Sequence, residues 1–218
     1  MSSSHAAAVP ADGIATYDPA VDAPAPHAPV YDYDSGPPVD RGKFAMWLFL
    51  ATEVMFFTGL IGTYIVLRMG TPAWPNPENR LAVDITAANT FLLITSSWTM
   101  VRALQAIQNG DKKGLVRWLF GTIVGGTIFV SVQVYEYAEL IRHGSTPDVD
   151  IFWSTFYAMT GFHGLHVVVG VIWLVCVWVS ALRGSCTADS HLRIELAGLY
   201  WHFVDLVWVL LFTIVYLM

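Results

Sequence analysis

Residues 44–67 read FAMWLFLATEVMFFTGLIGTYIVL, an apolar run in which Glu53 is the one charged side chain. At about 1.5 Å of rise per residue, a helix of this length spans the roughly 30 Å hydrocarbon core of a bilayer. A carboxyl group at such depth costs about 2.5–3.5 kcal/mol on insertion scales, so it usually marks a functional site. The run therefore predicts a transmembrane helix that carries a functional acid.

Glu53 shares one face of this predicted helix with bulky apolar side chains, and small residues occupy the opposite face. The bulky residues are Met46, Phe49, Phe56, Phe57, Leu60 and Tyr64, and the small residues are Ala51, Thr58 and Gly62. We expect the small face to contact another helix. Glu53 would then face apolar groups, which favour a neutral carboxyl group. It is either a proton-handling or lipid-contacting acid, or a carboxyl group hydrogen-bonded to a neighbouring helix for packing.

The remainder of the chain is also apolar. Of its 218 residues 55% are hydrophobic and 13% are charged, which indicates an integral membrane protein rather than a soluble domain. The predicted spans are residues 44–67, 85–104, 115–140, 151–182 and 194–217. We therefore expect an all-α bundle of five transmembrane helices within residues 41–218.

Residues 1–40 differ from the rest in composition. They hold seven of the eleven prolines and six aspartates, with no lysine or arginine, so the whole formal charge of −6 lies in this segment. Such a segment cannot bury a core and is predicted to be a disordered acidic tail. It resembles neither a signal peptide nor a mitochondrial transit peptide, because it has no basic start, apolar stretch or arginine.

The basic residues predict the orientation in the membrane. One side has Arg41, Lys43, Arg102, Lys112, Lys113, Arg117, Arg183 and Arg193, and the other has Arg68, Arg80 and Arg142. Cytoplasmic loops are rich in lysine and arginine, so the N-terminus should be cytoplasmic and the C-terminus outside. The acidic tail would then lie on the cytoplasmic side, where its negative charges would raise the local proton concentration. It is either a proton-collecting or partner-docking segment, or an inert one.

Polar residues also lie inside the other spans. Gln133 and Glu136 are near the outer end of the third span, where we expect hydrogen bonds to neighbouring helices. His163 and His166 are three residues apart and share a face of the fourth span. Such a pair could bind a metal ion or hydrogen-bond across helices, and we favour the second.

The fifth span carries a polar arc. Glu195, Gly198, His202 and Asp205 lie within roughly 80° on a helix and must face protein or water rather than lipid tails. We interpret this arc as a polar packing seam. The sequence has no CxxC, CxxCH or HExxH motif, so we expect neither a metal site nor covalently bound haem in this chain.

Five stretches resemble, in order, those of subunit III of the haem–copper respiratory oxidases. They are ATEVMFFTGLIGTY at 51–64, ANTFLLITSS at 88–97, VQVYEY at 132–137, FYAMTGFHGLHVVVG at 156–170 and ELAGLYWHFVDLVW at 195–208. The resemblance covers everything after residue 43. The spellings GFHGLH and YWHFVD look more like the cytochrome c oxidase branch than the quinol oxidase branch. The five-span layout occurs in both, and a related group accompanies nitric oxide reductases.

The resemblance implies a subunit without a redox centre or chemistry of its own. It would pack against subunit I, which holds the haems and copper, with subunit II and in some complexes subunit IV as further partners. The complex would pass electrons from cytochrome c to oxygen and pump protons across a bacterial plasma membrane, within a respiratory supercomplex where one forms. Subunit III would stabilise subunit I, sustain proton uptake from the cytoplasm and hold phospholipid in a V-shaped cleft. Nucleic acid is not an expected partner.

The resemblance also implies roles for single residues. The family's carbodiimide-reactive carboxylate falls on Glu53, which is also a lipid-binding candidate. Residues near lipid head groups in the family suggest Arg183 and His191. The five-span form lacks two helices that supply further lipid ligands, so that site must be partly rebuilt or lost. The motif positions Glu136, His163, His166, His202 and Asp205 are expected to be structural.

Two other classes of function fit the residues when the family is set aside. Intramembrane glutamate and histidine would suit a small proton-coupled transporter, although the chain shows neither paired broken helices nor an inverted repeat. A membrane metalloenzyme would use His163, His166 and Glu53 as ligands.

Overall fold

The computed structural model describes residues 40–72, 74, 75, 81–184 and 191–217. The acidic tail up to residue 39, and with it the predictions of disorder and of a proton-collecting or docking role, lies outside the described residues. Arg80, one of the three bases assigned to the outer side, also lies outside them. All regular secondary structure in the described ranges is helical, which confirms the all-α class.

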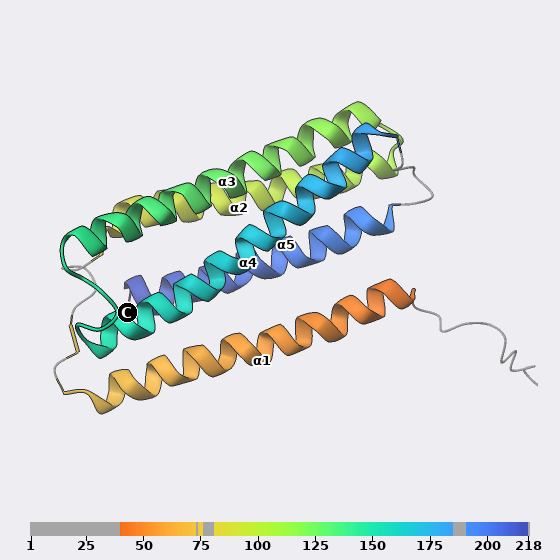
Figure 1. Cartoon of the computed structure of the whole chain (residues 1–218). Helices are drawn as coiled ribbons and strands as arrows, with labels where there is room; N and C mark the ends of the chain where they lie inside the picture. Colours follow the sequence, from red (N-terminus) through yellow and green to blue (C-terminus); the bar gives the residue numbers. More distant parts are fainter. Residues whose placement is uncertain (1–39, 73, 76–80, 185–190, 218) are drawn as a thin grey trace, which may run out of the picture. The chain divides into compact units, whose positions relative to one another are not determined.

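Five long helices make up the described part of the chain (Figure 1). They are α1 (Arg41–Gly70), α2 (Val83–Gln108), α3 (Lys112–Arg142), α4 (Ile151–Leu182) and α5 (Leu192–Phe212), and α5 continues into the π-helical turn η3 (Thr213–Leu217). The fourth predicted span has the bounds of α4. Most other ends run a few residues past the predicted spans, because polar residues at the membrane surface continue the helices.

Aspartates begin three of the helices. Asp40 accepts a hydrogen bond from the Gly42 amide at 2.7 Å. Asp111 caps α3 and Asp150 caps α4 in the same way. A carboxylate at this position pairs with an amide that has no partner inside the helix, and its charge suits the positive end of the helix dipole. These caps fix where α1, α3 and α4 start.

Among the described residues, four helices are long and apolar enough to cross a membrane: α1, α3, α4 and α5 with η3. Their length and composition, by themselves, indicate a multi-pass membrane protein. The helix α2 is more polar, but it has 26 residues and therefore a length of about 39 Å. It packs along α3, as Figure 1 shows. Its length and position are those of a fifth crossing helix.

The polar side chains of α2 explain its lower hydropathy. Trp208 of α5 donates its indole N–H to the Thr90 hydroxyl at 2.8 Å, and Trp201 donates to the Ser96 hydroxyl at 3.1 Å. Asn89 donates to the Phe129 carbonyl of α3 at 3.2 Å. All these α2 side chains are buried. The polar groups of α2 therefore hold neighbouring helices rather than face lipid tails.

The bundle places α1 on one side and α2 and α3 on the other, with α4 and α5 between (Figure 1). Only Leu50, Phe57 and Tyr64 of α1 are buried, at intervals of seven residues. The helix therefore contacts α4 and α5 along one narrow stripe.

The expected contact through the small residues of α1 is wrong within this chain. Ala51 and Thr58 are exposed, and there is open space beside Gly62. The bulky face points inward instead, because the aromatic side chains of α1 pack on those of α4 and α5, such as Phe57 on Phe203.

Candidate functional site

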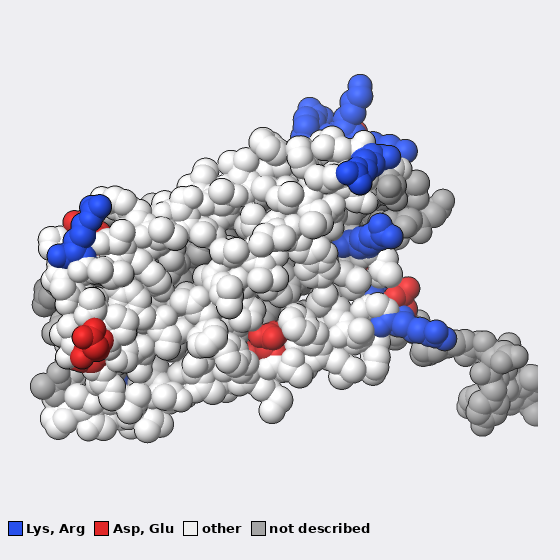
Figure 2. Space-filling view, viewed as in Figure 1, with Lys and Arg blue, Asp and Glu red and all other residues white. Residues whose placement is uncertain are grey.

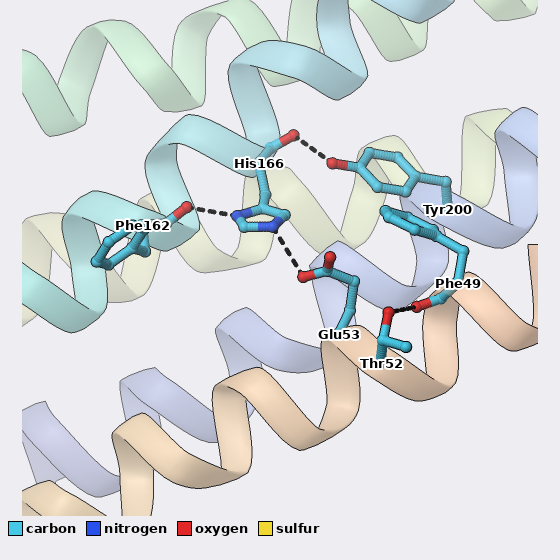
Figure 3. A network of polar contacts seen from close by, with 6 residues as sticks. All are labelled: Phe49, Thr52, Glu53, Phe162, His166 and Tyr200. Atoms are coloured by element: carbon cyan, nitrogen blue, oxygen red, sulfur yellow. Dashed lines mark hydrogen bonds and ion pairs between the residues drawn. The ribbon is translucent and has the colours of Figure 1, made fainter.

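The candidate site joins α1 to α4 through Glu53 and His166 (Figure 3). The Glu53 Oε2 atom lies 3.0 Å from Nε2 of His166, and both side chains are 17% exposed. Each helix presents its residue roughly midway along its length, so the contact lies within the membrane-spanning part of the bundle. Glu53 is therefore hydrogen-bonded to a neighbouring helix, which is one of the two interpretations of its sequence context.

The hydrogen bonds of His166 determine how many protons the pair holds. Its Nδ1 atom lies 2.6 Å from the Phe162 carbonyl oxygen, which can only accept, so Nδ1 carries a hydrogen. Nε2 then either accepts from a protonated Glu53 or, in an imidazolium, donates to a Glu53 carboxylate. Both states place one proton between Oε2 and Nε2, and both leave the pair with no net charge. This neutrality reduces the cost of burying the two groups.

Aromatic rings surround the pair. The His166 ring lies 5.1 Å from the Phe57 ring and 6.2 Å from the Phe56 ring, measured between centroids. Tyr200 of α5 donates its hydroxyl to the His166 carbonyl at 3.0 Å and stacks on Phe49 of α1. Aromatic side chains from three helices thus surround the Glu53–His166 contact, whose two side chains are mostly buried.

His163 takes no part in this pair. It is fully buried, with ring centroids 4.9 Å from Trp208 and 6.1 Å from Phe129. Neither of its ring nitrogens has a hydrogen-bond partner among the described residues. In the described ranges, no three His, Cys, Asp or Glu side chains gather as a metal site would require. The ligand set considered for a metalloenzyme is therefore not assembled there.

Glu136 of α3 joins three segments of the chain. It is 8% exposed and accepts a hydrogen bond from the Tyr216 hydroxyl at 3.1 Å. The Thr86 hydroxyl of α2 lies 3.3 Å from the same carboxyl oxygen. The third-span acid thus links α2, α3 and the C-terminal turn η3.

Gln133 lies one turn before Glu136. It is buried, and its side chain lies beside the side chain of Tyr137 on the same helix. It lines a cavity of about 160 Å³ between α3 and α4. The Tyr137 and Thr160 hydroxyls, 2.6 Å apart, face the same space. Gln133 is therefore placed beside a cavity rather than in a direct contact between the two helices.

Comparison with known proteins gives the family. A family model described as cytochrome c oxidase subunit III matches residues 34–218. The chain belongs to the cytochrome c oxidase subunit III family. This confirms the resemblance carried by the five motif stretches, which the match covers in full.

Named relatives come from both branches of the cytochrome c oxidase subunit III family. Cytochrome c oxidase subunit 3 of Synechocystis sp. is 42% identical over 182 residues, which cover 82% of this chain and 76% of the relative. Cytochrome c oxidase subunit 3 of Thermostichus vulcanus is 36% identical over 180 residues, covering 82% and 88%. Quinol oxidase subunit 3 of Bacillus spizizenii is 34% identical over 172 residues, covering 79% and 84%.

In this member of the subunit III family, the polar arc of α5 does not form one site. Glu195 forms an ion pair with Lys43 at 2.8 Å, and the His191 Nε2 atom lies 3.9 Å from its other carboxyl oxygen. Gly198 packs against Met100 of α2. The arc therefore meets different elements along its length, with Glu195 joining the beginnings of α1 and α5.

The remaining two residues of the arc, His202 and Asp205, are half-buried further along α5. The Asp205 side chain meets the Ser97 side chain of α2. Both residues lie beyond the part of α5 that meets Lys43, so they do not share the ion pair at its start.

The lipid-binding candidates lie at two depths. Arg183 ends α4 and His191 immediately precedes α5, both at the end of the bundle where most of the basic residues gather (Figure 2). Glu53 contacts His166, which lies 17 residues before Arg183 and hence about 25 Å along α4. One lipid head group cannot reach both levels. Glu53 therefore lies toward the middle of the bundle, whereas Arg183 and His191 lie at its end.

Proposed function

We propose that this chain is the non-redox subunit III of a proton-pumping terminal oxidase in a bacterial plasma membrane. The observation that carries the proposal is the family match, which extends through all five helices. The chain would pack against subunit I, which would hold the haems and copper, together with subunit II and in some complexes subunit IV. Purification through a tag on this chain tests the assignment, since a haem-containing subunit should accompany it.

Cytochrome c is the proposed electron donor of the complex. The 42% identical relative named above is a cytochrome c oxidase subunit, whereas the quinol oxidase subunit of Bacillus spizizenii is 34% identical. The GFHGLH and YWHFVD spellings favour the same branch. A quinol donor is the second candidate, because its branch shares the layout and much of the sequence.

The proposed role of the Glu53–His166 pair is to hold α1 against α4 through one proton in an apolar environment. Apart from the Lys43–Glu195 ion pair at its start, α1 contacts the other helices along a narrow apolar stripe, so the Glu53–His166 contact would help to fix the depth and the rotation of α1. Such a device would keep α1 in place beside the catalytic subunit and support proton uptake from the cytoplasmic side. Phospholipid would bind with its head group near Arg183 and His191 and its acyl chains passing Glu53.

Two substitutions of His166 should change the rate of carbodiimide labelling of Glu53 in opposite directions, because the reagent attacks the protonated acid. In His166→Leu the carboxyl group loses its basic partner in an apolar environment and should hold its own proton, so labelling should become faster. In His166→Arg a fixed positive charge should hold the carboxylate and slow labelling about tenfold. Mass spectrometry of the Glu53 peptide over time gives the rates.

The matched control for this labelling is His202→Leu, which removes a half-buried histidine of α5 and should leave the rate unchanged. Equal rates in His166→Leu, His166→Arg and the unmodified protein would show that the pair does not control the proton on Glu53.

Specific residues and helices argue against the two other classes of function, a metalloenzyme and a proton-coupled transporter. A metalloenzyme using His163, His166 and Glu53 would need the three side chains to converge, but His163 packs on Phe129 and Trp208 instead. Many secondary transporters form their binding site from broken helices. The regions of α1 and α4 around Glu53 and His166 are continuous α-helix.

A further inference from the structure

A pocket of about 610 Å³ lies between the beginning of α3 and the end of α4. From α3 it is lined by Lys112, Lys113, Val116 and Arg117, and from α4 by Ala181 and Leu182, with Gly184 at its edge. The pocket therefore combines three cationic side chains with an apolar wall. It is separate from the Glu53–His166 pair, and Arg183 is not among its lining residues.

We propose that this pocket binds the head group of an anionic phospholipid. Basic pockets between transmembrane helices on the cytoplasmic side suit such head groups. The proposal rests on the placement of this chain in a membrane and not on its assignment to an oxidase. It also differs from the lipid position at Arg183 and His191, because it assigns a second site on the side of the bundle formed by α3 and α4.

The charge of the pocket favours an anion. No acidic residue lines it, and none of its three cations forms an ion pair with another described residue. The neighbouring acid, Asp111, accepts a hydrogen bond from the Gly114 amide at 2.9 Å and caps α3. Figure 2 shows basic side chains gathered at one end of the molecule, and the three cations belong to that end because they begin α3.

The backbone keeps the pocket open on one side and closed beneath. Gly184 lies two residues after the end of α4 and has a φ of +76°, and no atom would lie within 4 Å of a Cβ atom added there. One turn below the cations, Trp178 of α4 donates its indole N–H to the Val116 carbonyl at 3.1 Å. The Trp178 ring also packs near Phe120, with centroids 5.8 Å apart. Tryptophan at this depth is typical of a membrane–water interface, where head groups lie.

Apolar side chains continue from the pocket toward the middle of the bundle. Phe120 and Val124 on α3, and Ile172 and Val175 on α4, are exposed. They present an apolar surface along which an acyl chain can lie. A free anion would use the cations alone, whereas a phospholipid would use both the cations and this surface, and the geometry thus points to a lipid as the source of the phosphate.

The proposal is tested on the full-length chain, purified in mild detergent with whatever subunits accompany it, by native mass spectrometry during titration with phosphatidylglycerol. Each cation near an anionic lipid contributes roughly a fivefold gain in affinity, so Lys112→Gln, Lys113→Gln and Arg117→Gln together should weaken the tightest binding about 100-fold. The matched control is Arg41→Gln, Arg142→Gln and Arg193→Gln, which removes three cations outside the pocket and should weaken binding less than fivefold. Equal losses in the two triple variants would overturn the proposal.

A second variant separates the pocket from general charge attraction. Ala181→Phe keeps all three cations but fills the space between them, so it should also remove the tight phosphatidylglycerol site. Retention of that site in Ala181→Phe would show that surface charge alone attracts lipid, contrary to the proposal. Glycerophosphoglycerol and inorganic phosphate, which have no acyl chains, should fail to compete at millimolar concentration. Competition equal to that of the lipid would mean a site for free anions. All these readouts are obtained whether or not haem subunits co-purify.

Discussion

Gly126→Ala should destabilise the bundle by about 1–3 kcal/mol, whereas Gly164→Ala should change its stability little. A methyl group at Gly126 would come within 2.9 Å of Trp201 Cζ2 and of Val171 Cγ2. Trp201 cannot easily move away, because it is 1% exposed and its indole N–H is bonded to Ser96. No atom would lie within 4 Å of the same methyl group at Gly164. Tryptophan fluorescence during denaturation of the purified chain measures the difference.

The contact between Gly126 and Trp201 also predicts a rescue. Trp201→Phe removes the ring atoms that the new methyl group would meet, at the cost of the bond to Ser96. Combined with Gly126→Ala, it should therefore cost less than the sum of the two single changes. Additive effects, or equal destabilisation by Gly126→Ala and Gly164→Ala, would mean that α3 and α5 do not pack as closely as described.

Glu136→Leu should destabilise the protein by about 1–3 kcal/mol, because it leaves the Tyr216 hydroxyl buried without its acceptor and removes the contact with Thr86. Glu136→Gln keeps an acceptor oxygen and should have a smaller effect. The thermal transition of the purified chain measures the loss of stability. A proteolysis assay then measures whether the C-terminal turn stays protected.

The matched control is Glu139→Leu on the same helix. Glu139 is 44% exposed and pairs with Arg142 and His143 at the surface, where such pairs contribute about 0–1 kcal/mol. A loss in Glu139→Leu as large as that in Glu136→Leu would contradict the role assigned to the buried acid.

The helices could be predicted because apolar composition and length are local properties of the sequence. Each predicted span is a helix, and α4 has the predicted bounds of residues 151–182. The polarity of α2 has a cause that lies outside its own sequence. Trp201 and Trp208 of α5 supply the hydrogen bonds that make its hydroxyl groups suitable for the interior. Such partners become visible only when the helices are packed.

The rotation of α1 could not be predicted from its own pattern of large and small residues. Small residues suit close helix contacts, but here Leu50, Phe57 and Tyr64 fill the space between α4 and α5. The identity of the Glu53 partner was open for the same reason. The similar depths of Glu53 and His166 could have indicated the pair, because α1 begins and α4 ends on the same side. Glu53 lies about 18 Å from that end of α1, and His166 lies about 24 Å from that end of α4.

Mild-detergent purification through an affinity tag on this chain tests the central claim most directly. We expect a large haem–copper subunit to co-purify in stoichiometric amount, with a haem signal in the reduced-minus-oxidised spectrum and oxygen uptake driven by reduced cytochrome c. Uptake driven only by a quinol would move the chain to the other branch of the family. If the chain is recovered alone and colourless while the oxidase of the same membranes stays intact in the unbound fraction, the assignment as an oxidase subunit is contradicted.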